Sequence, residues 1–204
     1  KTVEEGVEAF KKSGAQIVVI CSSDDDYATV APQINEMVAG KAIVVVAGAP
    51  GLSEDFYKPI LDRYRKVPPV RIVYGQTYDL LRAAKVAAVT SGTATLETAY
   101  LNVPQVVCYH MGGGPVVYKI FEFLLRRIRY VSLVNLLLDA PSVVELLGYK
   151  LTSERLREEI RRVLHDGADR DRQLAEYDRM REILGEPGAP KRAAEAIIKK
   201  LGNI

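Results

Sequence analysis

Short apolar runs alternate with longer helical patterns along most of the chain, and this alternation limits the fold more than any other feature. Six runs are continuously apolar, as in strands that are buried on both faces. These runs are residues 16–22, 42–48, 70–75, 86–91, 105–110 and 130–134. Helical patterns lie before and between them, at residues 2–12, 25–38, 53–66, 77–84, 93–101 and 116–127. This alternation predicts right-handed crossovers and a parallel sheet.

Helical patterns also fill the remainder of the chain, at residues 142–147, 153–164, 170–184 and 190–201. We therefore predict an α/β fold: a three-layer, doubly wound parallel sheet of about six strands, Rossmann-like or flavodoxin-like. A helical extension is expected over residues 151–204. Because the sequence shows no internal repeat and no low-complexity linker, residues 1–204 are predicted to form a single domain.

The composition is that of a soluble globular protein, with 48% hydrophobic and 26% charged residues. A formal net charge of +2 gives no reason to expect a nucleic-acid partner. No apolar run reaches the ~18–20 residues of a membrane span, and the amphipathic N-terminus does not resemble a signal peptide, so we expect a cytoplasmic protein. Cys21 and Cys108 lie in apolar runs, which favours buried, reduced thiols. The two histidines share no ligand spacing, and no metal site is predicted.

An acidic cluster, CSSDDD, follows the first apolar run. Three successive aspartates, Asp24 to Asp26, at a strand end raise the question of a Mg²⁺ site. A phosphoacceptor-type site also needs an acid after a second strand and a lysine after a later one, whereas those runs end in AGAPG and YHMGGG. We therefore expect one aspartate to cap the next helix and the others to favour its dipole.

The strand ends are the places to look for a ligand site, because ligands of doubly wound sheets bind beyond the carboxyl ends of the strands. In TSGTATLE, Ser91, Gly92 and Thr93 stand between a strand and a helix N-terminus, which favours phosphate binding. Glu97 follows about one helical turn after Thr93 and is placed to accept from ribose hydroxyls. On spacing alone the alternative stays open, in which Ser91 and Thr93 only cap the helix and Glu97 supports its first turn.

Two further segments are less specific. Asn135 ends the run VSLVN, where its amide is placed either to reach a pyrophosphate or sugar or simply to cap the strand end. The helical pattern at residues 116–127 is largely apolar, with Arg126, Arg127 and Arg129 at its end. We interpret it as a core helix with a solvated cationic end, favoured by the helix dipole, rather than as a membrane contact.

From about residue 45 to residue 204 the chain resembles the C-terminal, donor-binding half of lipid-A-disaccharide synthase, a GT-B glycosyltransferase. The resemblance rests on AGAPG, RIVYGQTYDLL, VTSGTATLETAYLNVPQVVCY, YVSLVNLLLD and EYDRMREILGEPGAPKRAAEAI. It implies transfer of a sugar unit from UDP-2,3-diacylglucosamine to lipid X, with release of UDP. The implied contacts are uridine near Gly75, Gln76 and Thr77, diphosphate at Ser91, Gly92 and Thr93, ribose at Glu97, and further donor contacts at Asn135.

The first 42 residues or so resemble a different family. The run FKKSGAQIVVICSSDDDYA is similar to part of the cobalamin-binding, flavodoxin-like domain of methylmalonyl-CoA mutase. The Asp-x-His-x-x-Gly loop that carries that family's cobalt ligand is absent, so neither cobalamin nor any other cofactor is expected. These resemblances predict a grafted segment at residues 1–42, a crossover near residues 41–51, and the rest of the sheet and its helices over residues 43–150.

Together the two resemblances lead us to expect an engineered chimeric α/β scaffold with no native catalytic activity, and therefore not an enzyme. The resemblance also implies that the acceptor domain and the first donor loop of the synthase are missing. The alternatives are a residual module that binds UDP or UDP-diacylglucosamine weakly, and half of a glycosyltransferase of lipid A biosynthesis. The resemblance further implies terminal helices that cross to the other domain of the synthase, so we expect apolar surface exposed on them here to favour a homodimer.

Overall fold

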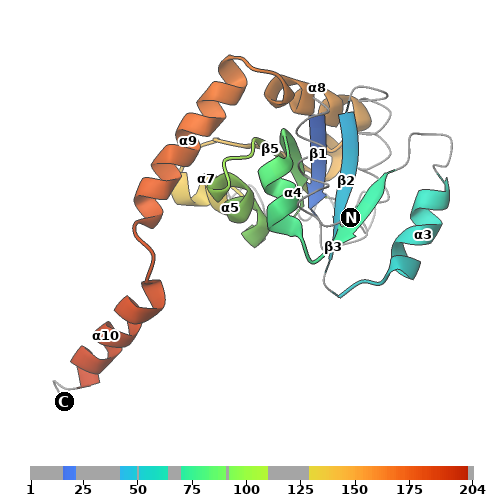
Figure 1. The fold of residues 1–204 in the computed structure, drawn as a ribbon. Helices are drawn as coiled ribbons and strands as arrows, with labels where there is room; N and C mark the ends of the chain where they lie inside the picture. The colour runs from blue at the N-terminus through green and yellow to red at the C-terminus, as the bar shows by residue number, and fades with distance from the viewer. Residues whose placement is uncertain are drawn as a thin grey trace.

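A six-stranded parallel sheet forms the centre of the protein, as seen in the computed structural model, which describes residues 16–21, 42–49, 51–63, 70–90, 92–109 and 129–201 (Figure 1). The strands run in the order β3-β2-β1-β4-β5-β6, and every pairing is parallel. Their bounds are β1 Gln16–Cys21, β2 Ala42–Gly48, β3 Arg71–Tyr74, β4 Val86–Val89, β5 Gln105–Tyr109 and β6 Val144–Leu147. The chain reverses its direction of travel between β1 and β4, as a doubly wound sheet does, and the predicted fold class is confirmed.

Helices cover both faces of this sheet and continue beyond it (Figure 1). Helix α8 packs on β4 and β5 on one face, while α4 and α5 contact strands on the other face, where α7 packs against α5. Helix α9 contacts α5, α7 and α8, and α10 projects away from the rest of the molecule. The bounds are α3 Glu54–Arg63, α4 Thr77–Ala83, α5 Gly92–Tyr100, α7 Leu133–Leu138, α8 Ser153–Leu164, α9 Ala168–Leu184 and α10 Ala189–Leu201, with a 3₁₀ turn at Gly148–Lys150.

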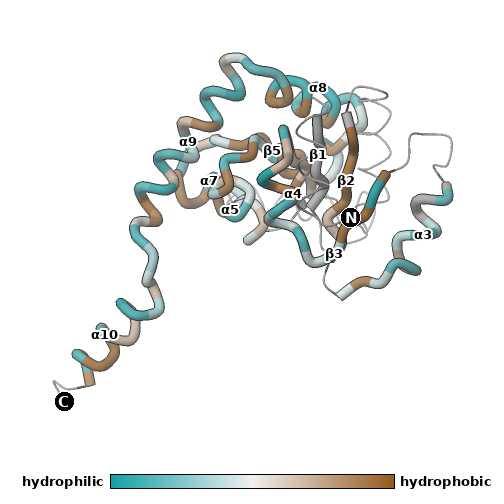
Figure 2. Tube along the Cα trace, viewed as in Figure 1, coloured by the Kyte–Doolittle hydropathy of each residue, from teal (hydrophilic) through white to brown (hydrophobic). Residues whose placement is uncertain are grey.

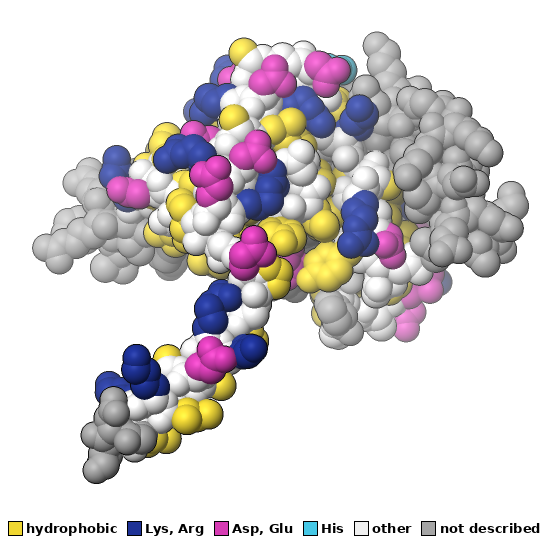
Figure 3. Space-filling model, turned by 60° about the vertical axis from the view of Figure 1, so that its left-hand side comes forward, with side chains coloured by type: hydrophobic (Ala, Val, Ile, Leu, Met, Phe, Trp, Pro, Cys, Tyr) yellow, Lys and Arg dark blue, Asp and Glu magenta, His cyan; other side chains and the backbone are white. Residues whose placement is uncertain are grey.

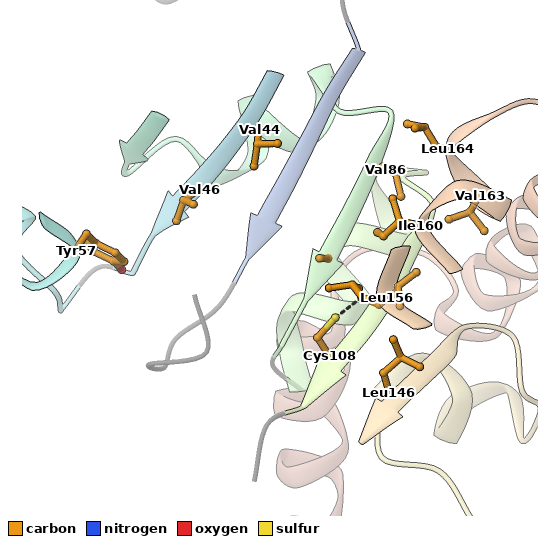
Figure 4. Packing of buried hydrophobic residues seen from close by; sticks show 12 residues of the cluster. Val44, Val46, Tyr57, Val86, Cys108, Leu146, Leu156, Ile160, Val163 and Leu164 are labelled. Atoms are coloured by element: carbon orange, nitrogen blue, oxygen red, sulfur yellow. Dashed lines mark hydrogen bonds between the residues drawn. The ribbon is translucent and has the colours of Figure 1, made fainter. Parts of the chain in front are cut away.

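The core is divided by the alternation of side chains along each strand. In β2, Val44 and Val46 belong to the cluster under α8, whereas Val45 and Ala47 belong to the cluster under α4. Both sets are buried, which is why this strand reads as a continuous apolar run (Figure 2). Figure 4 shows the α8 side of the core, where Ile160 lies beside Val86 of β4.

Cys108 belongs to the same cluster, beside Leu156 of α8 (Figure 4). It is buried, as predicted, and its Sγ lies 3.8 Å from the carbonyl oxygen of Val106. The other predicted thiol, at Cys21, lies outside the side chains that the structure describes. So do the helices predicted at residues 2–12, 25–38 and 116–127, and the aspartate cap predicted at residues 24–26.

Five of the six predicted strands are confirmed, but the sixth prediction is wrong. Residues 130–134 are not a strand: Ser132 caps α7, and its hydroxyl accepts a hydrogen bond from the backbone N–H of Asn135 at 3.3 Å. The sixth strand is instead β6, within residues 142–147, where we predicted a helix. Apolar runs this short fit either structure locally, and the pairing of β6 with β5, from Val106↔Val144 to Tyr109↔Leu147, decides between them.

Candidate functional site

Two of the predicted ligand segments lie along one edge of the sheet. Gly75, Gln76 and Thr77 follow the carboxyl end of β3, and Gly92 and Thr93 begin the helix that follows β4. Strands β2 and β1 separate β3 from β4, so the two strand ends are three inter-strand steps, or about 14 Å, apart. The two segments therefore form one elongated edge rather than a single compact pocket.

The start of α5 is open to solvent. Gly92 and Thr93 are both exposed, and the first turn of the helix contains no acidic side chain. A Cβ placed on Gly92 would meet the Cδ1 of Leu133 at 4.0 Å, an ordinary contact, and Gly92 does not have a positive φ. Neither packing nor backbone conformation requires glycine here, so the missing side chain serves chiefly to leave the first N–H groups of the helix accessible. Ser91 lies outside the described residues.

The threonines of this segment have different tasks. Thr95 and Thr98 are buried, and their hydroxyls donate to the carbonyl oxygens of Gly92 at 2.6 Å and Ala94 at 2.7 Å. Thr93, in contrast, is exposed, and its hydroxyl has no hydrogen-bond partner in the described part of the chain. Only Thr93 of the three is therefore available to a ligand.

Glu97 lies one helical turn further along α5 and is half-buried. Within the described residues its carboxylate has neither a hydrogen-bond nor an ion-pair partner. A half-buried carboxylate without such a partner is unusual, because burial weakens its hydration. Glu97 is thus free to accept hydrogen bonds from a bound molecule.

Asn135 has a different environment from the one that its sequence position suggested. It lies in α7 rather than at a strand end and is 2% exposed. Its Nδ2 donates to the Val143 carbonyl and to Glu145 Oε1, both at 2.9 Å, and its Oδ1 accepts from the Val143 amide at 2.9 Å. Both amide protons are used inside the protein, so Asn135 holds the connection from α7 to β6 together.

Glu145 is a residue that the sequence analysis missed. Its carboxylate accepts from the backbone amides of Val131, at 3.0 Å, and Ser132, at 2.8 Å, and from the Ser132 hydroxyl at 2.7 Å. The protein thereby places its own anion at the N-terminus of α7. The only available signal was a glutamate inside the apolar run SVVELL, and the helix predicted there would have left it on a solvated face.

The segment after β3 turns sharply into α4. Gly75 has a φ of 70°, in the left-handed region that favours glycine. Gln76 is the N-cap of α4, but its side chain makes no capping hydrogen bond and has no other partner among the described residues. Thr77 is half-buried in the first turn. This segment therefore presents a free side-chain amide at the same edge as Gly92.

Other parts of the described chain offer no competing centre. The residues that the structure describes include no group of three or more His, Cys, Asp or Glu side chains placed to hold a metal ion. A hollow of about 380 Å³ on α8 is lined by the charged side chains of that helix alone: Glu154, Arg157, Glu158, Arg161 and Arg162. None of the helices in the described ranges has the length and hydropathy to span a bilayer.

Most of the sequence matches a known family. Residues 28–199 match the family described as lipid-A-disaccharide synthetase. The chain belongs to this family. Lipid-A-disaccharide synthases of Anaeromyxobacter dehalogenans strain 2CP-C and Myxococcus xanthus strain DK1622 are 38% and 39% identical to it, over 154 and 135 residues. These alignments cover 76% and 66% of this chain but only 39% and 34% of the relatives, so the chain spans less than two-fifths of their length.

Solved structures show the same fold at lower sequence identity. UDP-GlcNAc 2-epimerase from Neisseria meningitidis, bound to UDP-GlcNAc, superposes with a TM-score of 0.61 at 14% identity, over 97% of this chain and 48% of its own. WaaG, a glycosyltransferase involved in lipopolysaccharide biosynthesis, gives 0.54 at 12% identity, over 96% of this chain and 52% of its own. The sheet and its helices are therefore of the type found in GT-B glycosyltransferase domains.

These comparisons correct two expectations. The chain belongs to a family of enzymes, glycosyltransferases, so the expectation of an engineered scaffold without native activity, and of a chain that is not an enzyme, is wrong. The family match begins at residue 28, inside the segment 1–42 that was assigned to a mutase fragment. The lipid-A-disaccharide synthetase pattern thus reaches into the supposed graft, and the comparisons give the chimera no support.

Proposed function

We propose that the chain is the nucleotide-sugar-binding half of a lipid-A-disaccharide synthase, with UDP-2,3-diacylglucosamine as its donor substrate. The observation that carries this proposal is the open start of α5 at the carboxyl edge of the sheet, in a chain of this family. The UDP-GlcNAc 2-epimerase that shares the fold also binds a UDP-sugar, which supports the same class of ligand. The acceptor, lipid X, would bind to a part of the synthase that corresponds to the portion of the relatives outside the alignment with this chain.

In this proposal the accessible N–H groups at the start of α5 bind the donor diphosphate. As the bond between sugar and diphosphate breaks, negative charge accumulates on the departing UDP. The partial positive charge at a helix N-terminus stabilises that charge, and more strongly as it develops. Thr93 adds a hydroxyl donor, and the unpaired carboxylate of Glu97 accepts from the ribose hydroxyls. Gly75, Gln76 and Thr77 contact the uridine. No metal ion and no cobalamin take part.

Titration calorimetry with UDP tests this site. We expect measurable binding by the wild-type chain and a Kd raised about tenfold to a hundredfold in Glu97→Ala, since a hydrogen bond to a charged group contributes about 1.5–3 kcal/mol. Gly92→Ala is expected to fold normally, because the new methyl group only reaches contact distance from Leu133, yet to weaken UDP binding by covering the helix N-terminus.

Glu154→Ala, which removes an exposed glutamate from α8, is the matched control and should bind UDP as the wild type does. Absence of heat at millimolar UDP would overturn the proposed function. A Gly92→Ala variant with unchanged affinity would overturn the placement of the diphosphate at α5.

The C-terminal helices are proposed to join two copies of the chain. Three apolar side chains of α10, Ile197, Ile198 and Leu201, are 60%, 69% and 64% exposed. Figure 3 shows hydrophobic side chains gathered along one side of the projecting helix and basic ones along another. A second copy that covers the apolar side would remove this surface from water. We further propose that the protein works in the cytoplasm as a single α/β domain.

A further inference from the structure

The ring of Tyr74 lies against the backbone of Gly48. Gly48 and Tyr74 are directly paired at the carboxyl ends of β2 and β3, so their side-chain positions share one face of the sheet. A Cβ built on Gly48 would lie 2.4 Å from both Cδ1 and Cε1 of Tyr74. The ring therefore occupies the space of the missing side chain, and it needs glycine there to reach this position.

A second tyrosine supports the ring from the side. Tyr57 of α3 meets Tyr74 edge-on, with ring centroids 5.9 Å apart and an interplanar angle of 63°. Tyr57 is 2% exposed, and its hydroxyl accepts a hydrogen bond from the Ala49 amide at 2.9 Å. Phe56 packs edge-on against Tyr57 in turn, at 5.2 Å. Tyr74 thus rests on groups that are themselves held in place.

Tyr74 nevertheless remains 38% exposed. Partial burial, with the nearby Tyr57 and Glu54, raises the pKa of its hydroxyl. Other exposed tyrosines, Tyr78 and Tyr100, have no aromatic neighbour within the described ranges. A fixed, partly exposed aromatic surface at a sheet edge is what a flat ligand ring requires for stacking, because little side-chain entropy is then lost on binding.

A free polar group follows this ring two residues along the chain. The chain turns at Gly75 directly after Tyr74, and Gln76 follows with its side-chain amide unpaired in the described part of the structure. A glutamine amide carries a donor and an acceptor side by side, as does the hydrogen-bonding edge of a pyrimidine. Stacking surface and complementary edge thus occur within three residues of sequence.

We propose that Tyr74 is the platform on which the pyrimidine base of the nucleotide stacks, with the Gln76 amide at the polar edge of the base. This inference rests on the proposed function, because it assumes that a nucleotide binds along this edge. The strand order separates Tyr74 from the start of α5 by three inter-strand steps, about 14 Å, a distance that the ribose and diphosphate of one nucleotide can span.

The test compares two ligands, UDP and inorganic pyrophosphate, by titration calorimetry against the 204-residue chain. Base–aromatic stacking is strong enough that Tyr74→Ala should raise the Kd for UDP about fivefold or more while leaving that for pyrophosphate unchanged. Tyr74→Leu, which still covers Gly48, should lose affinity in the same way, and Tyr74→Phe should retain it. Tyr100→Ala removes an exposed tyrosine elsewhere and should match the wild type.

NMR of the ligand provides a direct readout, because a stacked ring shifts the uracil H5 and H6 resonances upfield. We expect this shift with the wild type and Tyr74→Phe, and its loss with Tyr74→Leu. If the wild type binds UDP and Tyr74→Leu binds it equally well, or if pyrophosphate binding falls as much as UDP binding, the inference is wrong while the proposed function stands. If the wild type binds no UDP, both are wrong.

Discussion

Replacing Asn135 with alanine separates a structural role for this residue from a ligand-binding one. In the structure its amide satisfies both the N–H and the C=O of Val143, each at 2.9 Å, in a place where both residues are 2% exposed. Alanine would leave these two backbone groups buried without a partner. Each orphaned group costs about 1–3 kcal/mol, so we expect a loss of about 4 kcal/mol from the free energy of unfolding.

Such a loss is a large share of the ~5–15 kcal/mol that holds a domain of this kind folded. Urea denaturation followed by circular dichroism measures it, with Leu136→Ala as the control in the same helix. Leu136 is 50% exposed, and its truncation should cost less than about 1 kcal/mol. Glu145 retains three other donors in Asn135→Ala and should contribute little to the loss.

The opposite result would refute this reasoning. If the free energy of unfolding of Asn135→Ala lies within about 1 kcal/mol of the wild-type value but the variant no longer binds UDP, then Asn135 contacts the ligand and the hydrogen bonds to Val143 are dispensable. Loss of stability with UDP affinity retained below the new unfolding midpoint supports the structural role.

Two further predictions concern other parts of the molecule. Burial raises the pKa of Tyr177 far above its usual value, so the folded state keeps the hydroxyl proton at a pH where the unfolded state has lost it. The free energy of unfolding should therefore not depend on this group below pH ~10. Above that pH it should fall by about 1.4 kcal/mol per pH unit. Tyr177→Phe should lack this component in alkaline urea titrations, and an equal slope in both proteins would contradict it. For the proposed dimer, light scattering should give twice 22.6 kDa for the wild type and one copy for Ile198→Glu, with Lys199→Glu as a control that stays dimeric. A monomeric wild type would rule the dimer out.

The sheet was largely predictable from the sequence because strands buried on both faces are apolar throughout. β2 begins and ends where its apolar run does, and β4 and β5 differ from their runs only at the end. The error at the sixth strand has a physical cause: YVSLV and SVVELL are both short apolar runs, and pairing with β5, together with the Ser132 cap, selects the second. Such long-range contacts do not show in local pattern.

The candidate site was likewise predicted only in part from the sequence. Reasoning from strand ends placed Gly75 and Gly92 at the carboxyl edge, where the structure has them, although their contacts with a ligand remain predictions. A ligand-stacking role for Tyr74 was not predicted, because the position of its ring depends on the strand register that pairs Tyr74 with Gly48. The family was visible in its motifs, whereas the family match from residue 28 gives no support to a mutase fragment at the N-terminus.

Two helix N-termini lie close together near this edge, and their contrast indicates where an anion would bind. Gly92 of α5 approaches Leu133 of α7, yet the amides that precede α7 already bond to the carboxylate of Glu145. A second anion there would meet this negative charge and find those donors occupied. The first turn of α5 has no acidic residue and is exposed. The protein thus places its own carboxylate beside one helix start and leaves the start of α5 exposed, which supports the proposed binding of the diphosphate at α5.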